Sequence, residues 1–173
     1  MINSEILTMD YCTQGLYEIL GNEGYSKFQE RQKKTPQEPF VQGMLHRAGR
    51  AGFYYWLRQP DVLQKAQDPG FRFSPVKKKI YTGLQWICDC FTNGNEIPLS
   101  LDQTAEGWII SVQRNRAEKV KCPWLDFHYL AGFCQEFASW AGLGKFYRVR
   151  ILEDLEDPQI LAKIIIQKDP IDS

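Results

Sequence analysis

The sequence lacks several features that would assign a function class directly. It contains no run of about 18 apolar residues, which a membrane-spanning helix needs. Its 21 basic and 21 acidic residues balance, so there is no surplus of positive charge for nucleic acid. Gly-rich phosphate loops, G-x-S-x-G elbows and dinucleotide fingerprints are also missing. We therefore expect neither a nucleic-acid-binding nor a membrane-spanning protein.

Histidine is scarce, and no close cysteine pair of the metal or redox type occurs. Cys122, His128 and Cys134 follow a C-x5-H-x5-C spacing, whereas zinc sites use closer pairs. The other histidine, His46, lies far from these residues in the sequence. We expect no metal, no cofactor and no catalytic residue.

The five cysteines are an odd number, and no signal peptide precedes them. This combination is typical of free thiols in a reducing compartment, so we expect a cytoplasmic protein. Cys88 and Cys90 are separated by one residue, which is not the redox spacing. Cys88 falls on an apolar helical stripe and is expected to be a small buried hydrophobe.

Aromatic residues are abundant, with 5 Trp, 8 Tyr and 10 Phe. Length and apolar periodicity predict a single α+β domain over residues 1–173, which opens with an N-terminal helical region and loop (1–37). A polar loop is expected at 30–39 and a connector between Pro60 and Ser74. The expected helices are 5–30 with a break at 21–24, 38–57, 76–91 and 126–141. Strands of two hairpins are expected around 99–102, 108–113, 147–151 and 162–166.

Two helices carry the functional signals. The helix at 38–57 has interior glycines (Gly43, Gly49 and Gly52), each weakening a helix by about 1 kcal/mol relative to alanine. We expect that loss to be offset by the close approach of another backbone or of a ligand. The helix at 127–141 is apolar on two opposite sides, so it should be buried on both.

The segments KCPW (121–124) and FHYLAGFCQEFASWAGLGKFYRVRILEDLEDP (127–158) resemble the 4-vinyl reductase, or hydrocarbon-binding, domain family. RAGRAGFYYWL (47–57) and FRFSPVKKKIYTGL (71–84) also fit it, so the resemblance covers about residues 38–168. That family shares its fold with small subunits of the transport-particle (TRAPP) vesicle-tethering complex. The resemblance implies helices on one side of a four-stranded antiparallel sheet, an apolar tunnel, and dimerisation through helices.

The chain departs from that family at its suspected metal ligands. Of the family's cysteines only Cys122 remains, Phe127 stands at the helix-start position, and no cysteine follows Pro158. A metal site of the family type is therefore not expected here. Local basic clusters, at 77–79 and 114–121, are most simply solvated faces. The alternative is an anionic head group held at a pocket mouth.

Three functions remain open at this point. The first is a non-enzymatic protein that holds a small hydrophobic ligand, such as an acyl chain or a tetrapyrrole, in an apolar pocket. The second is a homodimeric adaptor with a vestigial pocket, and the third is a component of a tetrapyrrole vinyl-group reductase. The predicted pocket residues are Met44, Ala48, Gly52, Phe53, Trp56, Ile80, Leu84 and Phe133. The predicted dimer surface consists of Tyr11, Tyr17, Phe28, Phe53 and Tyr54.

Overall fold

The computed structural model describes residues 11–35, 38–95, 98–113, 127–153 and 155–171. The chain divides into two compact units, each described here by itself. Unit 1 comprises residues 1–72 and 124–133, and unit 2 comprises residues 73–123 and 134–173. The prediction of a single domain over 1–173 stays a prediction.

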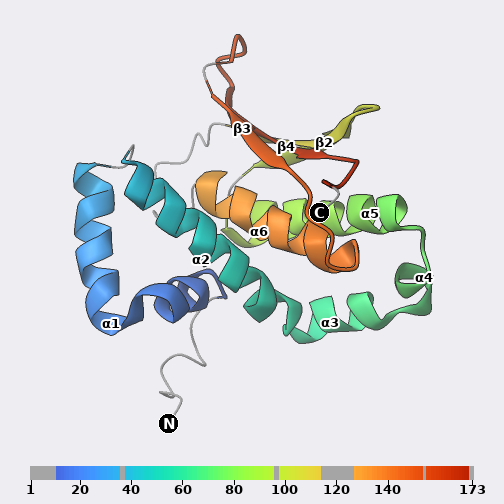
Figure 1. The fold of residues 1–173 in the computed structure, drawn as a ribbon, viewed down its shortest axis with the longest axis horizontal. Helices are drawn as coiled ribbons and strands as arrows, with labels where there is room; N and C mark the ends of the chain where they lie inside the picture. Colours follow the sequence, from blue (N-terminus) through green and yellow to red (C-terminus); the bar gives the residue numbers. More distant parts are fainter. Residues whose placement is uncertain (1–10, 36–37, 96–97, 114–126, 154, 172–173) are drawn as a thin grey trace. The chain divides into compact units, whose positions relative to one another are not determined.

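Unit 1 is helical (Figure 1). The helix predicted at 38–57 is confirmed, because Pro39 occupies its first turn, where a missing N–H costs nothing. The first helix ends later than predicted, so the polar loop expected from residue 30 is shorter. The helices are α1 (Tyr11–Lys34), α2 (Pro39–Leu57), α3 (Pro60–Gln67), α4 (Pro69–Arg72) and the beginning of α6 (Phe127–Ala141).

The break predicted at residues 21–24 of the first helix is confirmed at Gly21. Its backbone has φ 67° and ψ 178°, a conformation that is essentially restricted to glycine. Figure 1 shows α1 changing direction at this point. The rings of Tyr17 and Tyr25 stack across the bend with their centroids 4.6 Å apart.

The connector predicted after Pro60 contains two short helices, α3 and α4, that the sequence did not predict. Both helices begin at a proline, which their first turn accepts without losing a hydrogen bond. Their apolar sides are short, and only three of their residues are buried: Val62, Ala66 and Phe71. Apolar positions this sparse do not establish a helical period in a sequence.

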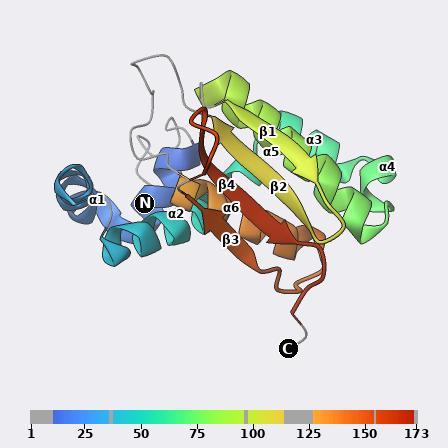
Figure 2. The same ribbon diagram turned by 90° about the horizontal axis from the view of Figure 1, so that it is seen from above.

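Unit 2 contains a four-stranded antiparallel sheet with the strand order β1-β2-β4-β3 (Figure 2). Its helices are α5 (Val76–Asn95), which runs four residues beyond the predicted end at 91, and the remainder of α6. The α+β class and both predicted hairpins are confirmed. The strands are β1 (Leu99–Gln103), β2 (Gly107–Gln113), β3 (Val149–Leu152) and β4 (Ile160–Gln167).

One face of the sheet forms the core of unit 2. The register pairs Trp108 with Ile166 and Ile110 with Ile164, so these side chains share a face and are at most 1% exposed. α5 and the second part of α6 lie on one side of the sheet in Figure 2. The alternation of apolar and polar residues that predicted the hairpins reflects this one-sided burial.

α6 ends at a glycine in the left-handed backbone region. Gly144 has φ 84°, and its N–H donates to the Ser139 carbonyl oxygen at 2.8 Å, which closes the last turn. The predicted helix start at Asp126 lies outside the described residues. Within the part of the chain that the structure describes, no helix is long and apolar enough to cross a membrane.

Candidate functional site

The small residues of α2 let two other helices approach it closely within unit 1. A Cβ added to Gly15 of α1 would lie 2.7 Å from the Gly52 nitrogen, closer than real Cβ atoms come. On the other side, a Cβ added to Gly49 would lie 3.0 Å from the Phe133 nitrogen of α6. Of the two explanations for these glycines, the structure therefore supports the approach of a backbone.

The exception is Gly43, where a Cβ would have no heavy atom of another residue within 4 Å beyond its own helix backbone and chain neighbours. It lies in the same helix as Gly49 but is exposed. Gly43 therefore destabilises the helix relative to alanine without allowing any close packing in return. It serves as a comparison for Gly49 and Gly52, where another helix lies close.

An aromatic cluster fills unit 1 beside this helix crossing. Phe53 and Phe133 meet edge to face at 5.9 Å, and Trp56 and Phe133 meet at 5.4 Å. Tyr129 adds a further ring at 6.3 Å from Phe133. All four side chains are at most 2% exposed, and Tyr54, which is 42% exposed, packs against Phe53 at 5.0 Å. We call these five residues the aromatic cluster.

The predicted pocket residues fall into separate groups. Ala48 and Gly52 lie at the crossing with α1, whereas Phe53, Trp56 and Phe133 belong to the aromatic cluster. Met44 is half-buried on α2, whereas Ile80 and Leu84 are fully buried in α5 of unit 2. A cavity lined by all eight residues stays a prediction.

Two buried thiols lie in unit 2. Burial raises the pKa of Cys88 to about 12, with the nearby charge of Asp89 adding to the shift. Burial also raises the pKa of Cys134 well above its usual range, and Cys88 adds to it. Both groups therefore remain protonated at neutral pH and are poor nucleophiles or metal ligands. Cys122 lies outside the described residues.

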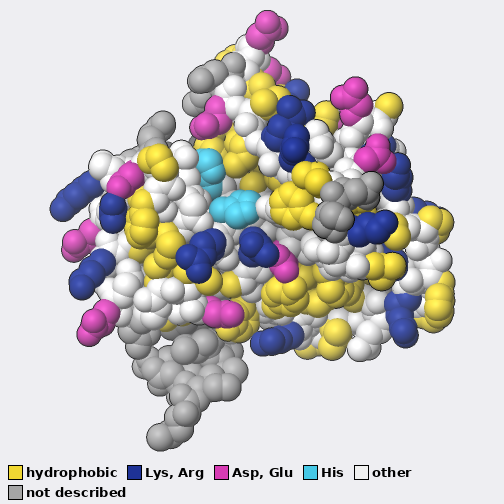
Figure 3. Space-filling model, viewed as in Figure 1, with side chains coloured by type: hydrophobic (Ala, Val, Ile, Leu, Met, Phe, Trp, Pro, Cys, Tyr) yellow, Lys and Arg dark blue, Asp and Glu magenta, His cyan; other side chains and the backbone are white. Residues whose placement is uncertain are grey.

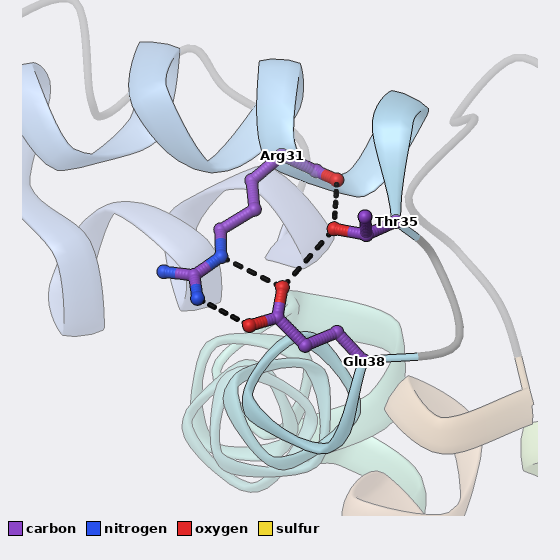
Figure 4. A network of polar contacts seen from close by, with 3 residues as sticks. All are labelled: Arg31, Thr35 and Glu38. Carbon is purple, nitrogen blue, oxygen red and sulfur yellow. Dashed lines mark hydrogen bonds and ion pairs between the residues drawn. The ribbon is translucent and has the colours of Figure 1, made fainter.

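A polar network joins the end of α1 to the start of α2 (Figure 4). The Arg31 guanidinium donates to both carboxylate oxygens of Glu38, with the Nε–Oε2 distance at 2.8 Å. Thr35 donates to the same carboxylate at 3.0 Å. Arg31 also lies 4.3 Å from the ring centroid of Phe40. The hydrogen bond from Arg31 lowers the pKa of Glu38, so the carboxylate is held ionised.

The two histidines of the chain both belong to unit 1. His46 lies on α2 and His128 on α6, and each is half-buried. The Phe127 ring lies 4.8 Å from the His128 imidazole. Among the described residues, no group of three or more His, Cys, Asp or Glu side chains lies close enough to hold a metal ion.

The dimer surface predicted from sequence was wrong at two of its residues. Phe28 and Phe53 are 3% and 0% exposed, so they belong to the core of unit 1. Tyr54 is exposed and Tyr17 is half-buried, whereas nothing is described for the Tyr11 side chain. A homodimer stays a prediction.

The structure describes one of the two predicted basic clusters, the one at 77–79. Lys77 and Lys78 are exposed, and Lys77 forms an ion pair with Asp169 at 3.0 Å within unit 2. This favours the solvated face over an anion site at 77–79. The cluster at 114–121 lies outside the described residues.

Sequence reasoning missed two contacts that organise unit 1. The partners of the α2 helix, Gly15 and Gly132, were not singled out, and neither was the Arg31–Glu38 pair. A single glycine in a helix is a weak signal of close packing, because the sequence does not show which backbone lies opposite it. The i, i+7 separation of Arg31 and Glu38 spans a helix boundary and matches no helical pairing rule.

Comparison with known proteins shows the fold and corrects the family. No family model matches the chain, and no curated protein matches it. Solved structures do match. A doubly substituted Tt H-NOX protein has a TM-score of 0.52 at 13% identity, covering 97% of this chain and 96% of its own. A singly substituted Tt H-NOX protein has a TM-score of 0.54 at 12% identity, covering 94% of both chains. A third structure, titled for the function of heme distortion in the H-NOX family, has a TM-score of 0.53 at 11% identity, covering 98% and 96%.

The resemblance to the 4-vinyl reductase and TRAPP families was therefore wrong, because the structural neighbours are H-NOX domains. One of the motifs that suggested it is the pattern of aromatic and small residues at helical spacing in α6. Tyr129 and Phe133 are buried there, and Gly132 contacts the α2 backbone. Any helix that is buried on two sides requires such a pattern. The motif therefore indicates that α6 is buried, and it does not show that the chain is related to the 4-vinyl reductase family. At these identities, the likeness shows that the chain has the fold of H-NOX domains.

Proposed function

We propose that this chain is a non-enzymatic domain that binds a small apolar ligand, and that the ligand is a tetrapyrrole held by aromatic contact. The observation that carries the proposal is the aromatic cluster in a fold shared along nearly the whole chain with H-NOX domains. One of those neighbours is titled for heme distortion. The acyl-chain alternative loses its basis together with the family resemblance that suggested it.

The two buried thiols and the crossing of α2 with α6 do not fit a heme whose iron is held there. Heme iron takes an axial imidazole, thiolate, thioether or phenolate. Cys88 and Cys134 are held as protonated thiols, so neither supplies a thiolate. A Cβ on Gly132 would lie 3.0 Å from the His46 Cα, so the two histidine-bearing helices leave no room for a macrocycle between them.

A tetrapyrrole bound without an axial side chain would depend on its flat apolar surface. Phe53, Trp56 and Phe133 are at most 2% exposed and pack against one another, so a planar π-system would reach their faces and edges only where a ring moves aside. Each ring pair formed in this way is worth about 0.5–1.5 kcal/mol beyond area burial. Tyr54 extends the cluster to the surface of unit 1. The chain would therefore bind a tetrapyrrole through the shape of its apolar surface and through stacking of its aromatic rings.

The buried residues of polar type among the described residues are Gln14 and Ser111. The Tyr129 hydroxyl and the Nε2 atom of His128 are buried as well, at the edge of the aromatic cluster in unit 1. General acid–base catalysis needs a titratable group within hydrogen-bond reach of the reacting atom. The described core therefore offers a ligand mainly apolar surface.

Titration of the full chain with protoporphyrin IX and, separately, with hemin tests the proposal. We expect Trp fluorescence quenching at one equivalent and affinities for the two compounds within about tenfold, since the metal contributes little (about 1.4 kcal/mol at most). Phe133→Leu should weaken protoporphyrin binding by about two- to tenfold, the value of one aromatic contact. Phe91→Leu is the matched control, because Phe91 is fully buried in unit 2 and lies outside the aromatic cluster.

Two results would overturn the proposal. One is the absence of saturable binding for both compounds. The other is hemin binding more than about 100-fold tighter than protoporphyrin, together with an absorption spectrum of axial imidazole that is lost in His128→Gln.

A further inference from the structure

β3 lies at one edge of the sheet in unit 2. The strand order places it beside β4 alone among the described strands, and Figure 2 shows it bordering the sheet. Its Leu152 side chain is 41% exposed. Phe146 and Ile171 form an isolated bridge just before β3 begins, and their side chains are 52% and 40% exposed. A strand edge with exposed apolar side chains is a template on which another strand can pair.

The peptide groups on the outer side of β3 belong to its odd-numbered residues. The Gln167 N–H of the neighbouring chain segment donates to the Arg148 carbonyl oxygen at 3.0 Å. Because every second residue of an antiparallel strand bonds to the same neighbour, the even-numbered residues of β3 direct their peptide groups towards β4. Val149 and Ile151 therefore direct theirs to the outer side, where the described sheet has no further strand.

The charges along this edge change sign from one end to the other. Arg148 and Arg150 are exposed at its start, whereas the exposed side chains that follow β3 are acidic: Glu153, Glu156 and Asp157. Figure 3 shows acidic side chains at the tip of the turn after β3, with Lys or Arg side chains lower along the strands. A second copy that runs antiparallel brings the basic half of each edge opposite the acidic half of the other. The edge is therefore self-complementary, as a two-fold interface requires.

We propose that a second copy of this chain docks antiparallel on β3, with Ile151 of both copies on the two-fold axis, so that the two sheets become continuous. In this register, Ile151 bonds to its counterpart, and Val149 bonds to Glu153 of the second copy, through the peptide groups that face outward. An axis at Arg150 would place like charges directly opposite each other, and one at Leu152 would carry the pairing into the turn after β3. The symmetric pairing uses the same edge of both copies and therefore stops at a dimer.

This proposal goes beyond the proposed function, because the β3 edge needs no tetrapyrrole. It also uses a different surface from the helical one predicted from sequence, whose two phenylalanines are buried.

The outward N–H of Ile151 gives the most direct test. Ile151→Pro removes this donor without removing a bond between β3 and β4, and edge strands accept proline at such positions. Ile151→Ala is the matched control, because it shortens the same side chain and keeps the N–H. In sedimentation velocity of the full chain up to about 200 µM, which suits a small interface, we expect a reversible dimer for the wild type and for Ile151→Ala. Ile151→Pro should weaken dimerisation by about 30-fold, since each dimer loses two hydrogen bonds.

Charge reversal tests the complementarity of the edge. Arg150→Glu places acidic side chains in both halves of the edge, so dimerisation should weaken by about tenfold at low salt and by less in high salt. Lys78→Glu makes the same change of charge at an exposed residue of α5, which lies on the helical side of the sheet (Figure 2). It should leave dimerisation unchanged, and equal weakening by the two variants would overturn the proposal.

Cross-linking determines the register without depending on the stability of the proline variant. Position 150 of one copy should lie opposite position 152 of the other, with Cα atoms about 4.5 Å apart, and about 7–8 Å from its own counterpart. Arg150→Cys mixed with Leu152→Cys should therefore form an intermolecular disulfide that neither variant forms alone, as located by peptide mapping. A chain that stays monomeric throughout, an Ile151→Pro variant that dimerises like the wild type, or equal cross-linking in unmixed samples would each overturn the proposal. No tetrapyrrole is added in these measurements, so their outcome is independent of the proposed function.

Discussion

Replacing Gly49 by alanine tests whether the glycines of α2 exist for helix packing. The added methyl group would lie 3.0 Å from the Phe133 nitrogen and even closer to the Tyr129 backbone, which cannot turn aside as a side chain can. Overpacking of this kind costs about 1–3 kcal/mol, and a backbone obstacle places it near 3 kcal/mol. The better helix propensity of alanine returns about 1 kcal/mol. We therefore expect Gly49→Ala to lower the free energy of unfolding by about 2 kcal/mol.

Gly43→Ala is the matched control in the same helix. Its added methyl group has open space around it, so only the propensity gain of about 0.5–1 kcal/mol remains. Thermal unfolding followed by circular dichroism should show Gly49→Ala about 4–8 °C below the wild type and Gly43→Ala about 1–4 °C above it. Equal or higher stability for Gly49→Ala would refute the packing explanation, and loss of stability in Gly43→Ala would show that the exposed position has a contact we have not identified.

Three further outcomes follow from the same contacts. Phe133→Ala should cost about 3–5 kcal/mol in urea unfolding because it empties the centre of the aromatic cluster, and a cost below about 1 kcal/mol would contradict its burial. The pKa of Glu38 is lowered in the folded chain by Arg31, so its contribution to stability is present above the unfolded pKa and disappears as pH falls. Glu38→Gln should therefore reduce the difference between urea midpoints at pH 6 and pH 3; an unchanged difference would contradict this. Thiol labelling at pH 8, mapped by mass spectrometry, should modify the half-buried Cys90 far sooner than Cys88, whose pKa is about 12, and equal rates would contradict the burial of Cys88.

The sequence predicted those elements whose signals are local. Pro39 and the stripe after it established α2, and the alternation around Leu99 and Leu101 established the first hairpin. Gly21 was found as a break because glycine interrupts a helical pattern on its own. α3 was missed because eight residues with two buried side chains do not establish a period.

The candidate site was predicted less well because its contacts are not local. Gly52 was singled out correctly as unusual, yet the residue opposite it, Gly15, lies 37 positions earlier in the chain. Phe53 was assigned at once to a pocket and to a dimer surface, and the structure places it in the core of unit 1. An apolar side chain in a sequence indicates burial but not the partner that buries it. The family was misjudged because its motif in α6 likewise indicates burial and not the structure around it.

The bend at Gly21 divides α1 into two parts that must each form a helix separately. A non-helical residue in the middle interrupts the ladder of i to i−4 hydrogen bonds, so each half must nucleate separately. Neither half is long enough to be stable as an isolated peptide in water. The first half is anchored by Gly15 against α2, and the second by the burial of Phe28 and the bond from Arg31 to Glu38. Amide hydrogen exchange should therefore report two protection levels within this one helix, with the change at the bend.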